Sequence, residues 1–295
     1  MPRREETLPD AIKDFLRRVY MKAEQDGIFF MAGAIAFNLI VAIVPLTLAA
    51  LGIAGLVLQK QQADPSQVLF NFIFSSLPPV GAEFESYLRK EVITPLLNRS
   101  SGFIGFGTLL LVWLSTRLVG TLRFTLREVY DVGEDRNILR GKWFDVQMVI
   151  AASLLFSVSV LGNVILTTVT ATGSEFLGVK PTAFGIQLFV SIAAAGALWV
   201  MFLLIYKFLP YRRVHWRTAL VSASFTTFAF EVLRRIFAWY ALNVANYSGT
   251  YANFINLVIL VFWMYWIGIA FIIGGEVGQV YSMRRIRRRQ KERLI

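Results

Sequence analysis

The sequence contains no cysteine, a single histidine and few charged residues for its length. Of its 295 residues, 17% are charged and 56% are apolar, whereas soluble domains are about 25% charged and about 45–50% apolar. The absence of cysteine excludes a disulfide-stapled secreted domain and a zinc or iron–sulfur site held by cysteines. The apolar excess excludes a disordered chain and argues against a water-soluble globule.

Catalytic motifs are equally scarce. One histidine cannot build a histidine-based metal site, and the sequence has no HExxH, GxSxG or P-loop pattern. The nearest carboxylate cluster, Asp131-Val132-Gly133-Glu134-Asp135, is followed by Arg136 and is typical of a charged helix end. A nuclease needs carboxylates that hold metal ions against a phosphate. We therefore predict no catalytic residue, no metal site and no cofactor, and ribonuclease activity is the least favoured function.

Long apolar runs are what the sequence has in abundance. A helix that crosses the hydrocarbon core of a membrane needs about 20 mostly apolar residues. Six runs meet this description: Phe29–Leu58, Phe103–Val119, Val146–Thr172, Phe184–Leu209, Ala219–Val244 and Phe254–Tyr281. The second continues directly into an amphipathic stretch, which predicts a single longer helix. The fold class expected is therefore all-α, a polytopic membrane protein with six transmembrane helices and additional amphipathic interfacial helices.

The net charge of +11 has a distinct distribution along the chain. Of the 30 Lys and Arg residues, 22 fall in residues 1–28, 120–144, 207–217 and 282–295, and 5 fall in the alternate segments 59–102, 173–183 and 245–253. The positive-inside rule then predicts that both termini are cytoplasmic. The first apolar run lies behind 28 mostly polar residues and is too long for a signal-peptide h-region of about 7–15 residues, so no cleaved signal is expected.

The segments outside the spans divide the chain into three parts: residues 1–28, a membrane domain over 29–281, and a polybasic tail over 282–295. Residues 9–23 carry apolar side chains at helical spacing with basic residues opposite. This pattern favours equally an amphipathic helix on the inner membrane surface and an ordinary helix packed on the bundle. The long outer loop 59–102 contains two short amphipathic stretches and is expected to contact the outer leaflet or a protein partner.

Charged residues within apolar runs are costly, at least about 2.5–3.5 kcal/mol each, and need a partner or a wet cavity. They form a candidate intramembrane polar site: Arg117, Glu231, Arg234, Arg235 and Glu276. A pair across helices between Arg117 and Glu276 is feasible, with Gly274 and Gly278 allowing close approach, and Glu231 can pair with the arginines three and four residues on. Packed ion pairs and a cavity for a charged head group are both consistent with these residues. Pro45 is expected to kink the first span.

Basic residues next to the spans are expected to contact lipid head groups. Juxtamembrane Lys and Arg side chains are attracted to anionic lipids by about 1 kcal/mol each. The candidates for these contacts are Arg212, Arg213, His215, Arg284, Arg285, Arg287 and Arg288. Their position beside the spans favours membrane lipids over nucleic acid as the partner.

Three blocks of sequence resemble a known family of bacterial inner-membrane proteins, the YihY/BrkB family, once labelled ribonuclease BN. They are Ala32-Gly33-Ala34-Ile35-Ala36-Phe37, the block Leu126-Arg127-Glu128-Val129-Tyr130-Asp131-Val132, and the stretch from Tyr206 to Tyr281 with Gly274-Gly275-Glu276. The resemblance implies a six-span helical protein with a role in moving or organising envelope lipids.

Two functions are consistent with the sequence. The first is transport or organisation of lipids or other amphiphiles, with anionic head groups as ligands. The second is a membrane scaffold that recruits envelope proteins at loop 59–102 and transports nothing. The sequence leaves the substrate, the energy coupling and the oligomeric state open.

Overall fold

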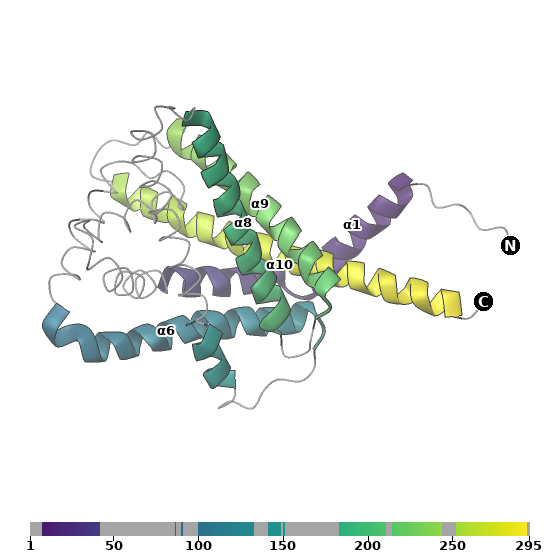
Figure 1. Cartoon of the computed structure of the whole chain (residues 1–295), viewed down its shortest axis with the longest axis horizontal. Coiled ribbons are helices and arrows are strands. Elements are labelled where there is room, and N and C mark those ends of the chain that lie inside the picture. Colours follow the sequence, from purple (N-terminus) through teal and green to yellow (C-terminus); the bar gives the residue numbers. More distant parts are fainter. Residues whose placement is uncertain are drawn as a thin grey trace, which may run out of the picture.

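The structure is a computed structural model that describes residues 8–41, 86, 90, 100–132, 141–148, 150, 183–210, 214–243 and 252–293. Within these ranges the ordered elements are helices and none is a strand, as the sequence predicts. The labelled helices are α1 (Leu8–Gln25), α6 (Ser100–Val129), α8 (Ala183–Phe208), α9 (Trp216–Asn243) and α10 (Ala252–Arg293) (Figure 1). Two further helices cover Ile28–Val41 and residues 141–148.

The helices begin and end close to the positions that periodicity predicts. The amphipathic stretch 9–23 lies within α1, and the second apolar run with its continuation forms the single 30-residue helix α6. The fourth and fifth runs coincide with α8 and α9 within three residues at each end. The sixth run lies within α10, which continues beyond Tyr281 through the basic segment to Arg293. Pro45, the second half of the first run, nearly all of loop 59–102 and the third run beyond residue 150 lie outside the described residues.

One helix segment of the described residues, Leu257–Arg287, is long and apolar enough by itself to cross a membrane. A second would be the bent pair Ile12–Gln25 and Ile28–Val41, whose axes differ by 67°. The bend falls at Gly27, which has a φ of +66°, a conformation that glycine adopts without steric cost. The six-span count and the orientation of the termini remain predictions.

α10 is the central helix and packs against α9, α6 and α1, while α8 packs on α9 (Figure 1). Buried aromatic side chains fill the contact between α8 and α10: the rings of Tyr206 and Phe271 stack with centroids 5.0 Å apart. The Tyr206 hydroxyl donates a hydrogen bond to the Phe271 carbonyl oxygen, 2.6 Å away, and lies 2.7 Å from Thr226 Oγ1 on α9. This side chain therefore joins three helices.

Small residues let α10 approach α9 very closely. A Cβ atom built at Gly274 would lie 1.8 Å from Thr226 Oγ1, and one at Gly278 would lie 2.0 Å from Ser222 Oγ. The two glycines are four residues apart and so share a helix face. The close approach expected from this spacing is confirmed, and the partner is α9.

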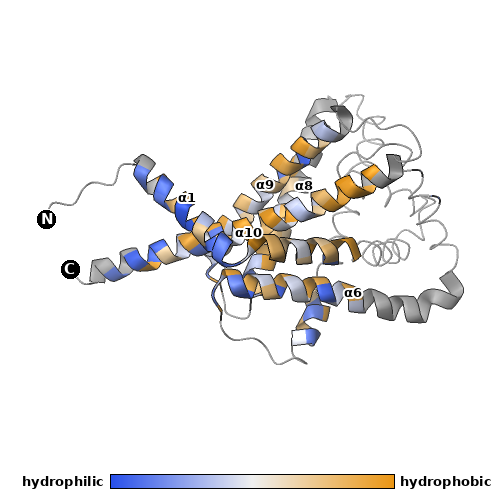
Figure 2. Ribbon diagram, turned by 180° about the vertical axis from the view of Figure 1, so that it is seen from behind, coloured by the Kyte–Doolittle hydropathy of each residue, from blue (hydrophilic) through white to orange (hydrophobic). Residues whose placement is uncertain are grey.

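The helices carry apolar side chains on their outer surfaces as well as at the contacts between them. Large apolar side chains are exposed on α8, α9 and α10, among them Ile192, Phe228, Trp239 and Phe262. Figure 2 shows hydrophobic ribbon along the middle of the bundle and hydrophilic ribbon on α1 and the last turns of α10. Exposed apolar area on this scale marks a surface that contacts lipid or another protein.

Candidate site at the junction of α1, α6 and α10

α1 has two apolar rows with different surroundings. Phe15 and Val19 pack against Val277 and Val280 of α10. The other row, at Ile12, Leu16 and Tyr20, is exposed by 57%, 60% and 69%. One row therefore matches the expectation of a helix packed on the bundle, and the other row leaves an apolar face available for a membrane surface.

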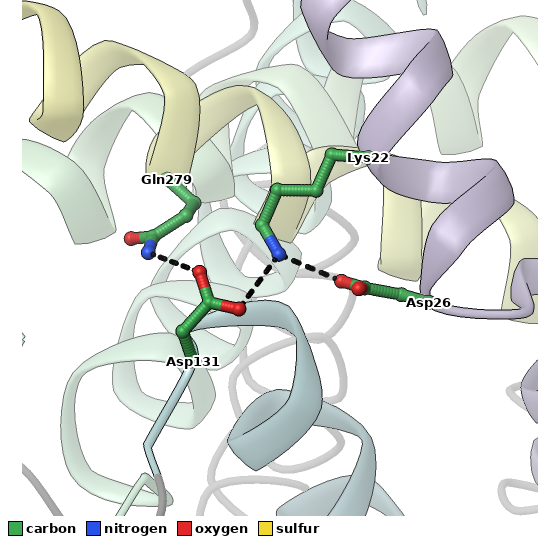
Figure 3. Close-up of polar contacts among 4 residues, drawn as sticks. All are labelled: Lys22, Asp26, Asp131 and Gln279. Carbon is green, nitrogen blue, oxygen red and sulfur yellow. Dashed lines mark hydrogen bonds and ion pairs between the residues drawn. The ribbon is translucent and has the colours of Figure 1, made fainter.

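Lys22 connects three segments of the chain (Figure 3). Its Nζ donates to Asp26 Oδ2 at 2.9 Å and to Asp131 Oδ1 at 3.1 Å, and Gln279 Nε2 donates to Asp131 Oδ2 at 3.3 Å. The Lys22 and Asp26 side chains are only 11% and 15% exposed, whereas Asp131 is 61% exposed. The network thus ties α1 to the C-terminal end of α6 and, through Gln279, to α10.

The position of Asp131 depends on how α6 ends. The amide of Val132 donates to the carbonyl of Arg127, and the amide of Asp131 donates to that of Glu128, which is the Schellman pattern of a helix C-terminus. Asp131 has a φ of +52°, in the left-handed region where glycine is the usual residue. A carboxylate at this strained position aims back at Lys22, and strain of this kind is typical of functional sites.

Burial and neighbouring charges shift the pKa of Lys22 in opposite directions. Burial works to lower the pKa of Lys22, but hydrogen bonds to Asp26 and Asp131 and the charge of Glu276 outweigh it and hold this pKa above the usual 10.5. The ammonium group is therefore charged at neutral pH and remains the counter-charge for the surrounding carboxylates.

Glu276 lies on α10, three residues before Gln279, and is completely buried. Neither of its carboxylate oxygens has a hydrogen-bond partner among the described residues. Its electrostatic neighbours are Lys22, Asp26 and Asp131. Counted from Leu257, where the apolar segment of α10 begins, Glu276 lies about 28 Å along the helix, close to the ~30 Å thickness of the hydrocarbon core.

A groove of about 170 Å³ runs between α1 and α10 beside the Lys22 network. Every charged side chain that lines it is basic, and its apolar lining comes from two methionines and a valine: Arg18, Lys22, Arg284 and Arg287, with Met21, Met283 and Val280. Asp14, at its rim, accepts hydrogen bonds from Arg18 Nε at 2.8 Å and Arg284 Nη2 at 2.7 Å. The lining is complementary to a phosphate group that carries an apolar chain.

The structure does not bring the predicted intramembrane residues together as one set. Among the described residues no ion pair or hydrogen bond links Arg117 to Glu276, and the Arg117 guanidinium lies 5.3 Å from the ring centroid of Trp113. Glu231 does pair with Arg234, at 2.8 Å across one helical turn, as the spacing predicts. Arg235 is exposed.

The predicted head-group residues do not all lie at one site. Arg284 and Arg287 line the groove, and the Arg284 guanidinium also lies 5.0 Å from the ring centroid of Phe15. Arg285 is half-buried, and His215 is exposed at the start of α9, where its carbonyl accepts the amide of Ala219. Arg288 lies in α10, and Arg212 and Arg213 lie outside the described residues.

Sequence reasoning missed the roles of Lys22 and Asp26, and it placed Asp131 correctly at a charged helix end without identifying its contact with Lys22. It assigned Lys22 to the polar face of an amphipathic helix and interpreted Asp131 as part of a charged helix end. One signal was present: Asp26-Gly27 directly before an apolar run marks a turn, so that α1 must fold back on the bundle. It also missed the contact between Arg123 Nη2 and the buried Asp145, 3.4 Å apart, which joins α6 to helix 141–148.

Comparison with known proteins identifies one family of membrane proteins. A model of the family described as "Virulence factor BrkB" matches residues 19–294. A UPF0761 membrane protein of Chlorobium luteolum is 28% identical over 289 residues, which cover 93% of this chain and 61% of that protein. A UPF0761 membrane protein of Alteromonas mediterranea is 24% identical over 266 residues, covering 90% of this chain and 86% of the relative.

A third relative, from Bacillus subtilis, is 26% identical over 197 residues, covering 64% of this chain and 70% of that protein, and is called "Putative ribonuclease-like protein YfkH". That description concerns the B. subtilis protein, whereas the description of the matched family names no enzyme. This chain spans 61% of the length of the C. luteolum relative. No solved structure matches the chain.

Proposed function

This chain belongs to the Virulence factor BrkB family and is an integral membrane protein, and on that premise we propose that it binds anionic lipids or other anionic amphiphiles of the bacterial envelope and moves or organises them. The observation that carries the proposal is the groove between α1 and α10, with four basic side chains and an apolar lining. Basic pockets at the ends of transmembrane helices are the usual binding sites of phosphate head groups.

The number of basic side chains in the groove predicts how strongly it prefers an anionic lipid. Each Lys or Arg contributes about 1 kcal/mol toward an anionic membrane surface. Asp14 offsets one of the four charges, and the carboxylates of Asp26 and Asp131 offset that of Lys22. The remaining two charges predict a preference for an anionic over a zwitterionic lipid of about 2 kcal/mol, or about 30-fold. Removing one groove arginine should then weaken anionic lipid binding about fivefold.

Binding is tested on the full chain in phosphatidylcholine nanodiscs. Dihexanoylphosphatidylglycerol is titrated, with dihexanoylphosphatidylcholine and glycerol phosphate as separate arms. Arg287→Gln, in the groove, should weaken phosphatidylglycerol binding, while Arg17→Gln, an exposed α1 arginine outside the groove lining, should not. Equal binding of both lipids, or equal losses in both variants, refutes the groove assignment. Binding of glycerol phosphate as tight as that of the lipid would identify a soluble anion as the ligand.

Movement is tested separately by reconstitution in liposomes that contain fluorescently labelled phosphatidylglycerol. Faster loss of fluorescence to a membrane-impermeant quencher in protein-containing vesicles supports transport. Binding without movement restricts the role to lipid organisation. If neither occurs and cross-linking in cells captures an envelope protein at 59–102, the scaffold function replaces the proposal.

We also propose the six-span arrangement in the inner membrane with both termini cytoplasmic. Its support is the coincidence of α6, α8, α9 and α10 with four of the six apolar runs, together with the asymmetry of basic residues. Because the chain has no cysteine, single cysteines can be introduced without a background. A thiol at Asn98 should react with an impermeant maleimide in spheroplasts and one at Glu24 should not; the reverse result inverts the topology.

A further inference from the structure

One exposed face of α9 is apolar except for a single arginine. Phe228, Val232, Arg235 and Trp239 recur at intervals of three or four residues and so lie on one side of the helix. All four side chains are exposed, Phe228 by 69% and Trp239 by 62%. This face therefore presents large apolar side chains around one guanidinium group.

Arg235 has no ion pair or hydrogen bond with the residues that the structure describes. The nearest carboxylate on the same helix, Glu231, is already held by Arg234, whose Nη2 donates to Glu231 Oε2 at 2.8 Å. Two positive charges and one negative charge thus lie within five residues of α9. The excess positive charge belongs to the arginine on the exposed face, and its electrostatic complement is an anion.

The contact between α9 and α10 sets the height of Arg235 in the bundle. Ser222 meets Gly278, which lies about 32 Å along α10 from the start of its apolar segment at Leu257. This contact therefore marks one boundary of a hydrocarbon core about 30 Å thick. Along α9, Arg235 lies about 20 Å from Ser222 and Trp239 lies about 26 Å from it. Trp239 is thus close to the opposite boundary, where tryptophan is enriched, and Arg235 is one turn inside it.

An arginine at this height needs an anionic partner. A guanidinium group in hydrocarbon is costly, and the cost is relieved when the side chain extends to the head groups and a phosphate is drawn down to meet it. A second copy of the chain is a poor partner, because two-fold symmetry about the membrane normal would place each Arg235 opposite the other at the same depth. Its Glu231 would be held by its own Arg234. A phospholipid offers the complementary charge, and its acyl chains match the exposed Phe228 and Val232.

We propose that Arg235 and the surrounding face of α9 form a second anionic head-group site, for a phospholipid of the outer leaflet. The groove residues of α10 lie on the other side of Gly278, from Val280 to Arg287, so the two sites are at opposite ends of the bundle. The inference rests on the membrane arrangement proposed above and does not depend on the groove. A lipid that moves between the leaflets would then meet an arginine at each end of its path.

The test is photo-cross-linking of the full chain in nanodiscs made of equal parts of phosphatidylglycerol and phosphatidylcholine. The photoreactive residue p-benzoylphenylalanine replaces Ile236, which is 54% exposed and adjacent to Arg235. The matched control replaces Ile192, which is 62% exposed on a stretch of α8 without charged residues, at the same end of the bundle (Figure 1). Mass spectrometry counts the two lipid adducts. One arginine predicts a ratio of phosphatidylglycerol to phosphatidylcholine adducts about fivefold higher at Ile236 than at Ile192.

Substitutions of the arginines assign the preference to one site. Arg235→Gln should lower the ratio at Ile236 to the value at Ile192, and Arg235→Lys should keep most of it. Arg287→Gln, in the groove, should leave the ratio unchanged. Equal ratios at the two positions, or a ratio that survives Arg235→Gln, overturn the site.

The same experiment identifies other occupants of this face. A cross-link between two copies at Ile236 assigns the face to self-association, and loss of the preference in excess glycerol phosphate assigns it to a soluble anion; both results overturn the lipid site. If the ratio at Ile236 holds while the groove binds no lipid, the proposed function of the groove fails and this site stands.

Discussion

Gly278→Ala is the most direct test of the helix packing that positions the site. The new Cβ would lie 2.0 Å from Ser222 Oγ, 3.1 Å from the Thr218 carbonyl oxygen and 3.3 Å from Ser222 Cβ. The Ser222 hydroxyl can rotate away, but it then loses its hydrogen bond to Tyr130. The carbonyl and the Cβ atom cannot rotate, so α9 and α10 must separate.

Three contributions set the size of the effect. Overpacking costs about 1–3 kcal/mol, and the lost hydrogen bond costs about 0.5–1.5 kcal/mol. Alanine regains about 1 kcal/mol over glycine in a helix. The free energy of unfolding should therefore fall by about 0.5–3.5 kcal/mol. The matched control is Gly196→Ala on α8, where a Cβ meets no atom within 4 Å and stability should stay unchanged or rise.

Unfolding is followed by tryptophan fluorescence in mixed micelles of a mild detergent and SDS, since Trp263 is buried in the bundle. In the Ser222→Ala background the cost of Gly278→Ala should shrink by at least about 0.5 kcal/mol, the range of coupling expected for residues in contact. If Gly278→Ala is as stable as Gly196→Ala, the close contact of α9 with α10 is wrong.

Four further predictions use the same unfolding assay. Tyr206→Phe leaves the volume intact but removes both hydrogen bonds of a buried hydroxyl, and should cost about 1–3 kcal/mol. Asp131→Gly should be about 1–2 kcal/mol more stable than Asp131→Ala, because both lose the carboxylate and glycine alone accepts the positive φ; equal stabilities contradict the left-handed helix end. Gly27→Ala should cost a similar amount for the same reason. Hydrogen bonds from Arg18 and Arg284 hold the pKa of Asp14 below 3.8. Its contribution to stability is therefore present above about pH 4 and is lost as the pH falls through the lowered pKa. Asp14→Asn should lack this acid-sensitive step below about pH 4.

The helices were predictable from sequence because they depend on local patterns. Periodicity placed α1 within two residues at each end, and the amphipathic continuation of the second run predicted the unbroken α6. The family resemblance is confirmed by the match over residues 19–294. The spacing of Glu231 and Arg234 predicted their ion pair because both lie on one helix.

The site was less predictable because its contacts join distant segments. Lys22 and Asp131 are 109 residues apart in sequence, and their contact depends on the bend at Gly27 and on the left-handed end of α6. Sequence reasoning recognised Glu276 as a costly charge and named Arg117 of another helix as a feasible partner. In the structure its electrostatic neighbours include Lys22, because α1 packs against α10 at Val277 and Val280.

The length of α10 determines how far its C-terminal residues move when the helix tilts. Its 42 residues span about 63 Å, roughly twice the ~30 Å hydrocarbon core of a bilayer. Gly278 clamps it to α9, and the 15 residues beyond form an arm of about 22 Å. A tilt of about 10° at this fulcrum would move Arg293 by about 4 Å and Arg287 by about 2 Å. The groove residues of α10 lie closer to Gly278 than Arg293 does. A small separation of α10 from α1 at the groove therefore produces a larger displacement of the basic C-terminal residues.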